Sequence, residues 1–174
     1  MKLAIVTGTS SGIGEAAARR FLEQGWRVIG VARRDAAIDA GDYHHVRADL
    51  GDESDLEQLT QDVLATALGD AALERVALVN NAALMGALGW MREADAEVLR
   101  PMLAVNVTAP LVLTGFLVRH VRVRLRIVNV SSGAAHSAYV GLGDYCATKA
   151  ALRIAGQTLA LELEQEGRRP ADVA

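Results

Sequence analysis

Tyr145 and Lys149 stand four residues apart in the segment YCATK, a spacing that places two side chains on the same face of a helix. A phenol has a reference pKa of about 10, and a nearby ammonium favours the ionised phenol, which suits proton transfer near neutral pH. Ser132 can donate a hydrogen bond to the same carbonyl oxygen and hold it where charge develops. The three side chains therefore predict a site for carbonyl reduction, although Tyr and Lys at this spacing are also common on exposed helices.

A glycine-rich turn, TGTSSGIG, follows the first apolar run, residues 3–6, and precedes a predicted helix over 14–24. Glycines let a backbone turn tightly and approach a ligand, and the N–H groups at the start of a helix favour a phosphate. The turn is a candidate site for a dinucleotide pyrophosphate. Its spacing, G-x-x-x-G-x-G, differs from the commoner G-x-G-x-x-G, and a tight turn without a ligand is the alternative.

The predicted second strand, residues 27–32, ends at Arg33 and Arg34. In dinucleotide folds an acidic group at this point binds the ribose 2′-hydroxyl, whereas arginine accommodates a 2′-phosphate. The guanidinium groups therefore favour NADP(H) over NAD(H). A solvated basic pair compensated by Asp35 is the alternative.

Polar or small residues also follow the third and fourth predicted strands. Asp49, followed by Leu50, can place a carboxylate against the adenine amino edge, or it can cap the helix that follows. Asn81 and Ala82 would border the cofactor channel, or they form a plain turn.

The elements that must position these residues alternate along the chain. Strands are predicted at 3–6, 27–32, 44–48, 76–79 and 125–130, and helices at 14–24, 52–68, 93–118 with a break or bend near Pro101, and 145–166. Because the strands read as apolar throughout, they favour a parallel sheet covered on both faces. The predicted fold is a doubly wound α/β sheet of the Rossmann type, in three layers, with its ligand at the carboxyl ends of the strands.

Composition narrows the function classes. The 174 residues fit one domain of about 150 residues, and 51% of them are hydrophobic. The net charge of −3 makes nucleic acid an unlikely partner, and the uncharged stretch 102–118 reads as a helix buried against a sheet, with no membrane partner expected. One cysteine and no signal-peptide pattern favour the cytoplasm, and the histidines lack metal-ligand spacing, so no metal is expected.

Together these motifs resemble the short-chain dehydrogenase/reductase family: TGTSSGIG is similar to its TGxxxGxG turn, NNAA to its NNAG, and Ser132 with YCATK to its catalytic residues. Asn106 in LAVNVTAP resembles the asparagine that completes the family's Asn-Ser-Tyr-Lys tetrad.

The resemblance implies a role for each matching residue. Tyr145 would be the acid/base, Ser132 would orient the carbonyl, Lys149 would bind the nicotinamide ribose, and Asn106 would support Lys149 through a water. The pyrophosphate and adenosine ribose would be held by Gly8, Ser10, Ser11, Ile13 and Gly14. Arg33 would bind the 2′-phosphate, Asp49 with Leu50 the adenine, and Asn81 with Ala82 the other ribose.

Two departures from the family pattern stand out. Ala83 replaces the glycine of NNAG and adds a methyl group beside the channel. The chain also stops at residues 168–174, which resemble the approach to the family's sixth strand, so the sixth and seventh strands, the Pro-Gly cofactor segment and the substrate lid are expected to be missing. We therefore expect one C-terminally incomplete domain, 1–174, with an unpaired sheet flank that lowers stability or needs a partner.

The expected function is an NADP(H)-dependent oxidoreductase of the carbonyl-reductase type, which interconverts a ketone or aldehyde and an alcohol. The substrate is expected to be a small molecule. The resemblance implies a homodimer or homotetramer through helices 93–118 and 145–166. The alternatives are a protein or fragment that binds NADP(H) without turnover and a purely structural β-α domain.

Overall fold

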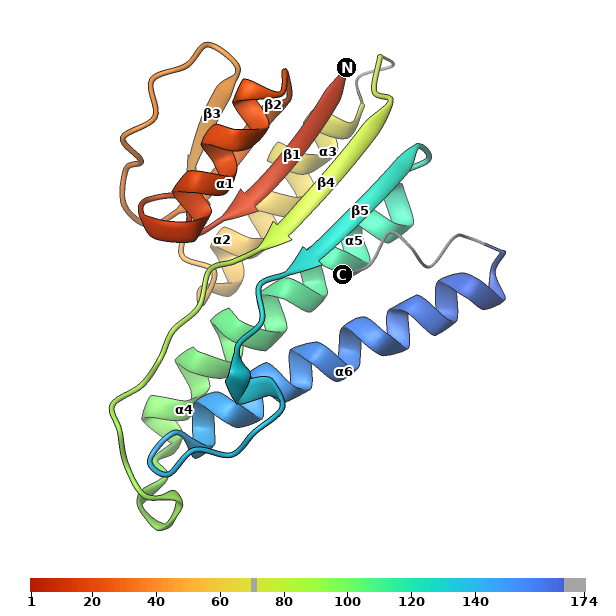
Figure 1. The fold of residues 1–174 in the computed structure, drawn as a ribbon. Helices are drawn as coiled ribbons and strands as arrows, with labels where there is room; N and C mark the ends of the chain where they lie inside the picture. Colours follow the sequence, from red (N-terminus) through yellow and green to blue (C-terminus); the bar gives the residue numbers. More distant parts are fainter. Residues whose placement is uncertain (70–71, 168–174) are drawn as a thin grey trace.

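The computed structural model describes residues 1–69 and 72–167. Its centre is a parallel sheet of five strands in the order β3-β2-β1-β4-β5 (Figure 1). The strands are β1 (Lys2–Thr7), β2 (Arg27–Ala32), β3 (Tyr43–Arg47), β4 (Arg75–Asn80) and β5 (Arg124–Asn129). Each lies within a few residues of its predicted position, and the doubly wound α/β fold is confirmed.

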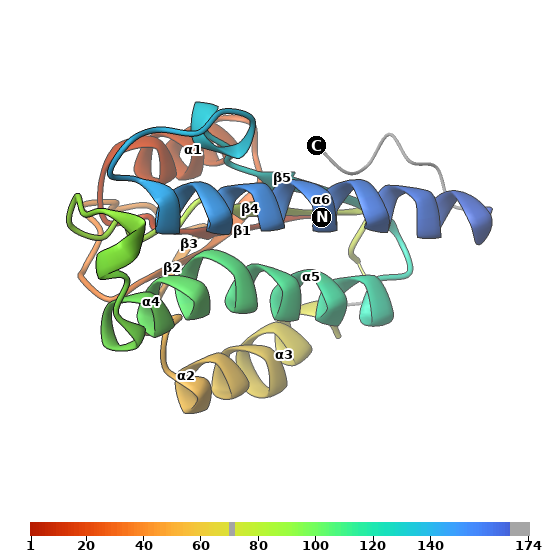
Figure 2. The same ribbon diagram turned by 90° about the horizontal axis from the view of Figure 1, so that it is seen from below.

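The helices lie on both faces of the sheet, as Figure 2 shows. On one face is α1 (Gly12–Glu23), whose residues pack with Val28 and Val79 of the sheet. On the other face are α2 (Glu53–Gln58), a π-helical turn (Leu59–Leu64), α3 (Ala65–Leu68), α4 (Ala96–Leu103), a second π-helical segment (Ala104–Thr108) and α5 (Ala109–His120). The last helix, α6 (Gly143–Gln165), lies beside α5 and β5.

The predicted bend near Pro101 is wrong in its position. Pro101 lies inside α4, which continues past it to Leu103. The irregularity comes a few residues later, where the helix takes up the π-helical form over Ala104–Thr108. Proline removes one N–H donor from a helix, but small adjustments of the neighbouring helical turns can compensate for the lost hydrogen bond.

Burial differs between the central and the edge strands. Every residue of β1 from Leu3 onward and of β4 from Val76 onward is buried, as is β2 after Arg27. The prediction that all strands are covered on both faces is wrong for β3, which is partly exposed, and for β5, where Arg124 and Arg126 are exposed. These strands form the two edges of the described sheet, where each has one neighbour.

The helical run Ala96–His120 is long and apolar enough to cross a membrane by length and composition alone, but 44% of its most apolar stretch is buried inside the protein. Leu113 and Leu117 are fully buried in the core beneath the sheet. Core helices pass the same test, and this burial agrees with the predicted packing against a sheet.

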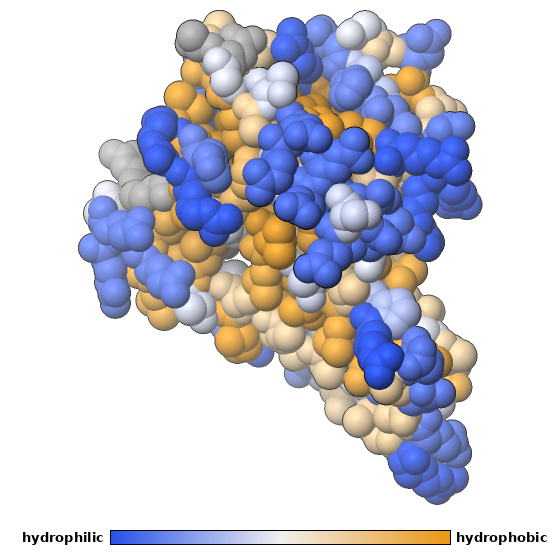
Figure 3. Space-filling view, turned by 180° about the vertical axis from the view of Figure 1, so that it is seen from behind, coloured by the Kyte–Doolittle hydropathy of each residue, from blue (hydrophilic) through white to orange (hydrophobic). Residues whose placement is uncertain are grey.

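The molecule exposes apolar side chains between charged ones, as the space-filling view from behind shows (Figure 3). On α4, α5 and α6 the exposed large apolar residues are Val98, Leu103, Leu111, Val112, Ile154 and Leu161. Within the described residues, β5 pairs with β4 alone. The expected continuation of the sheet, residues 168–174, lies outside the described residues.

Candidate functional site

A cleft of about 360 Å³ opens at the carboxyl ends of β1, β2, β3 and β4. It brings together nearly all the residues predicted to hold a cofactor: Gly8, Ser10, Ser11, Ile13, Arg33, Asp49, Leu50, Asn81 and Ala82. This is the edge at which doubly wound sheets bind ligands, because the strand order reverses beside β1.

Gly14 is missing from the cleft wall because it lies under the turn. A Cβ on Gly14 would lie 2.2 Å from the Gly8 carbonyl oxygen and 2.5 Å from Asn81 Nδ2. Gly8 has a φ of +75°, which favours glycine. The two glycines therefore let the start of α1 pack directly on the end of β1.

The first turn of α1 has no side-chain cap for its backbone N–H groups. Ser11 is the N-cap of α1, yet its side chain makes no capping hydrogen bond. Helix N-termini attract anions through their unpaired N–H groups and their dipole. The donor set, the tight glycine turn and the cleft fit a dinucleotide pyrophosphate.

Two guanidinium groups stand at the end of β2. Arg33 Nη1 lies 3.5 Å from Asp49 Oδ2, and Arg34 Nη2 donates to Ser10 Oγ at 3.4 Å. Arg33 is thus paired with Asp49 and not with Asp35. The alternative role for Asp49 as a helix cap is wrong, because Asp52 caps α2 by accepting from the Ser54 and Asp55 amides.

Lys149 is buried beside Tyr145 in α6. Its side chain is 5% exposed, Nζ donates to the Val130 carbonyl oxygen at 3.0 Å, and Nζ lies 5.7 Å from the centroid of the Tyr145 ring. Burial lowers the pKa of Lys149 below its ordinary value of 10.5. The Tyr145 hydroxyl is partly exposed and has no hydrogen-bond partner among residues 1–69 and 72–167, so its proton is available to a ligand.

Ser132 precedes a short 3₁₀ turn, Gly133–Ala135, that packs on α6. Its Oγ accepts from the Ala134 amide at 3.2 Å, which leaves the hydroxyl proton free to be donated. No hydrogen bond joins Ser132 to Tyr145 in the described part of the chain, so a shared carbonyl ligand stays a prediction.

Asn106 lies in the π-helical segment and is 1% exposed. It exchanges hydrogen bonds with the Leu84 backbone, each of 2.7 Å, and Nδ2 also lies 3.1 Å from Thr148 Oγ1. Asn106 therefore ties the segment after β4 to the residue that precedes Lys149. Its predicted link to Lys149 through a water stays a prediction.

The family model for the short chain dehydrogenase matches residues 2–171. The chain belongs to this family.

Individual relatives agree with the assignment. The chain is 31% identical over 173 residues to benzil reductase ((S)-benzoin forming) of Bacillus cereus, a match that covers 93% of the chain and 69% of that protein. Among solved structures, a short chain dehydrogenase from Burkholderia cenocepacia in complex with NADP has a TM-score of 0.80 and 32% identity, covering 96% of this chain and 70% of that one. The 3-ketoacyl-(acyl-carrier-protein) reductase of Brucella melitensis complexed with NADH has a TM-score of 0.82 and 28% identity, covering 94% and 71%.

None of the predicted catalytic side chains lines the cofactor cleft of this short-chain dehydrogenase, and Tyr145 and Lys149 line two other pockets. Tyr145 lines a pocket of about 230 Å³ together with Trp90 and Leu142. Both spaces border the segment after β4, since Leu84 lines the cleft and Gly86 the pocket. The cleft and the pocket are therefore linked along the chain by residues 84–86.

Several wall residues of the cleft carried no distinct signal in the sequence. Leu84 and Val105 are apolar residues that only the packing of the π-helical segment brings to the cleft. Arg34 also lines the cleft. In its case the sequence did hold a signal, namely its position next to Arg33 at the end of the second strand.

Replacing Gly14 with alanine should distort the turn, because the new Cβ would meet the Gly8 backbone oxygen at 2.2 Å. We expect Gly14→Ala to lower the free energy of unfolding by about 1–3 kcal/mol in urea denaturation. Gly41→Ala is the control, since a Cβ there meets nothing within 4 Å, and it should change stability by less than about 0.5 kcal/mol. Equal stability of the two variants would contradict this account of the turn.

The burial of Lys149 should make stability depend on pH. Because the pKa of Lys149 is lower in the folded than in the unfolded chain, the unfolded chain binds more protons between the folded value and 10.5. Stability should therefore rise with pH through that window, by at most about 1.4 kcal/mol per pH unit. The measurement is urea unfolding from pH 7 to 10.5 for the unmodified chain and Lys149→Met. As the pH rises, the free energy of unfolding of the unmodified chain should increase relative to that of Lys149→Met. Parallel curves of the free energy of unfolding against pH would refute the effect.

Proposed function

We propose that this short-chain dehydrogenase interconverts a ketone or aldehyde and an alcohol with NADP(H) as cofactor. The observation that carries the proposal is the cleft at the strand ends, where Arg33 and the glycine turn meet, with Tyr145 in a second pocket that borders the same segment after β4. Oxidoreductase chemistry follows from the family, and the cofactor preference and the reaction are the proposed parts.

The residues present fit a dinucleotide. Ser10, Ser11 and the first amides of α1 would hold the pyrophosphate, and Asn81 and Ala82 would border the ribose nearer the catalytic residues. When bound, the nicotinamide ring supplies or accepts the hydride. The protein's part is to orient the substrate oxygen and to move its proton.

Tyr145 would provide that proton. Its hydroxyl would donate to the carbonyl oxygen during reduction and accept a proton from the alcohol during oxidation. Lys149 would place an ammonium beside that phenol, since its Nζ lies 5.7 Å from the ring centroid and the residue is 5% exposed. Ser132 would donate a second hydrogen bond to the substrate oxygen, where charge develops.

The preference for NADP(H) is supported by charge at the end of β2. Arg33 and Arg34 both border the cleft there, and the one carboxylate paired with them, Asp49, comes from the neighbouring β3 side. A 2′-phosphate would compete with Asp49 for Arg33 and form charge-assisted hydrogen bonds. Solved relatives carry either NADP or NADH, so the family alone does not choose between them.

The name of the Bacillus cereus relative supports a carbonyl compound as substrate. We further propose a cytoplasmic homodimer or homotetramer formed through α4, α5 and α6. The exposed apolar residues Leu111 and Val112 of α5 and Ile154 of α6 support such an interface, since monomers rarely expose large contiguous apolar surfaces.

Arg33→Ala should weaken NADPH binding by about tenfold or more, because it removes a charge-assisted hydrogen bond to the 2′-phosphate. NADH binding should change by less than about twofold, since NADH lacks that phosphate. Fluorescence titration with both nucleotides measures this. An equal loss for the two would remove the assignment of Arg33 to the 2′-phosphate.

Tyr145→Phe should reduce turnover by at least about 100-fold, because it removes the acid/base and keeps the ring. NADPH binding should persist, since the cleft does not include Tyr145. The assay is NADPH oxidation against a panel of diketones, aldehydes and quinones. Binding without turnover in the unmodified chain would instead support a nucleotide-binding protein without activity.

A further inference from the structure

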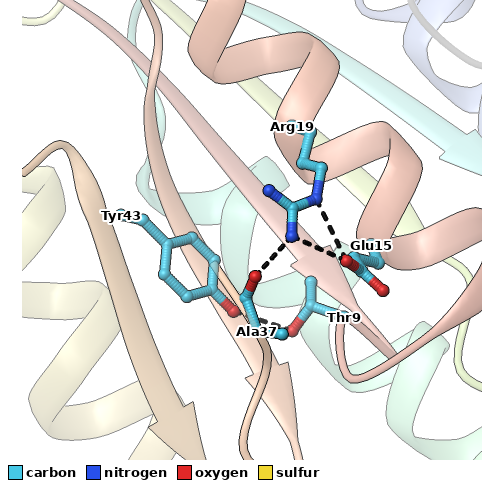
Figure 4. Close-up of polar contacts among 5 residues, drawn as sticks. All are labelled: Thr9, Glu15, Arg19, Ala37 and Tyr43. Carbon is cyan, nitrogen blue, oxygen red and sulfur yellow. Dashed lines mark hydrogen bonds and ion pairs between the residues drawn. The ribbon is translucent and has the colours of Figure 1, made fainter. Parts of the chain in front are cut away.

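A second set of polar contacts lies behind the glycine turn, on the face of the sheet covered by α1 (Figure 4). Tyr43 Oη donates to Thr9 Oγ1 at 3.0 Å. Close by, Arg19 pairs with Glu15 at 2.8 Å and also donates to the Ala37 carbonyl oxygen. Four separate segments thus meet here: the turn, α1, the loop after β2, and β3.

Tyr43 reaches the turn by crossing a whole strand. It is the first residue of β3 and pairs with Val28 of β2, while the sheet order places β2 between β3 and β1. Gly30 makes the crossing possible, because a Cβ there would lie 2.2 Å from the Tyr43 hydroxyl oxygen and 2.5 Å from Cε2. An aromatic ring that packs on a glycine of the neighbouring strand also shields the backbone there, which the glycine leaves exposed because it has no side chain.

The Tyr43 hydroxyl has two hydrogen-bonding neighbours. Besides Thr9 Oγ1, Tyr43 Oη lies 3.1 Å from His45 Nδ1. The hydroxyl therefore links His45 of β3 to Thr9 of the turn. Burial raises the pKa of Tyr43 above its ordinary value of 10.0, so the hydroxyl keeps its proton at neutral pH.

Thr9 is the point at which this link can act on the cleft. Thr9 is fully buried, and Tyr43 is the one hydrogen-bond partner of its hydroxyl among the described residues. Among residues 1–69 and 72–167, the segment between Gly8 and Gly12, both at positive φ, is otherwise tethered through side chains only by the longer 3.4 Å contact of Ser10 with Arg34. Ser10 and Ser11, which follow Thr9 directly, line the cleft.

We propose that Tyr43 is a positioning residue for cofactor binding, which acts by holding Thr9 and thereby the pyrophosphate-binding residues Ser10 and Ser11. The proposal rests on the proposed function in one respect, that the turn binds a dinucleotide. Tyr43 itself touches neither the cleft nor the catalytic residues. Its effect should therefore fall on the pyrophosphate, which NADPH and NADH share, and not on the 2′-phosphate.

Tyr43→Phe keeps the ring over Gly30 and removes the hydroxyl alone. The matched control is Thr60→Val, which removes another buried hydroxyl, one bonded to the Leu56 and Glu57 carbonyls within the helix. In the protein without cofactor, backbone order parameters of Ser10 and Ser11 should fall from about 0.85 toward about 0.6 in Tyr43→Phe and stay unchanged in the control. Unchanged order parameters in Tyr43→Phe would overturn the proposal.

Cofactor affinity gives the second readout. Tyr43→Phe and Thr9→Val should each raise the dissociation constants of NADPH and NADH by the same factor, about three- to tenfold. The double variant should be no weaker than either single one, because both remove the same hydrogen bond. Additive losses, or a loss confined to NADPH, would overturn the proposal. If the unmodified chain bound neither nucleotide, the proposed function would fail, and the order parameters would still decide whether Tyr43 holds the turn.

Discussion

The contact between the ends of β1 and β4 is the constraint on which the site depends. Thr7 Oγ1 accepts hydrogen bonds from the Asn81 and Ala82 amides at 2.9 and 3.0 Å, and it lies 3.3 Å from the Val79 carbonyl oxygen. Asn81 Nδ2 returns a hydrogen bond to the Thr7 carbonyl oxygen at 2.8 Å. These bonds satisfy backbone groups that would otherwise lack a hydrogen-bond partner at a buried end of the sheet. They also fix both walls of the cleft, since one wall begins at Gly8 and the other at Asn81.

The same fixation extends to α6. From Asn81 the chain runs to Leu84, whose backbone N–H and C=O are both bonded to the buried Asn106 side chain. Asn106 in turn contacts Thr148, and the next residue is Lys149. A continuous series of hydrogen bonds and short backbone segments therefore connects the glycine turn to the lysine beside Tyr145. Such buried networks favour one arrangement because a partly satisfied alternative is costly.

Local patterns were sufficient for the order of elements and for most of the cleft. Apolar runs located the strands, and the residues just after the first four runs line the cleft, because parallel strands end at one edge. The errors concern features that depend on neighbours in space. Asp49 was one candidate for the helix cap, but Asp52 caps α2. Asp49 instead faces Arg33 at the end of the adjacent strand. The partial exposure of β3 and β5 follows from their places at the edges, which depend on strand order.

The Tyr43 contact illustrates a kind of information that sequence patterns do not hold. Neither Gly30 nor Tyr43 belongs to a recognisable motif, and only the register of β2 against β3 places the ring over the glycine. Deriving that register requires knowing that β3 pairs with β2, and the reach to Thr9 requires knowing that β1 lies beyond it. Residues that bind a ligand can be found by type and spacing, whereas residues that hold them depend on the packed sheet.

Lys149 shows the opposing demands on such a site. Its ammonium is removed from water and satisfied by the Val130 carbonyl, and burial lowers its pKa, which works against the charge. The same burial holds the ammonium 5.7 Å from the centroid of the Tyr145 ring. A less buried lysine would cost the fold less, and its charge would be more strongly screened by water. The hydrogen bond to Val130 and the packing of α6 on the Gly133–Ala135 turn hold Lys149 in this buried position.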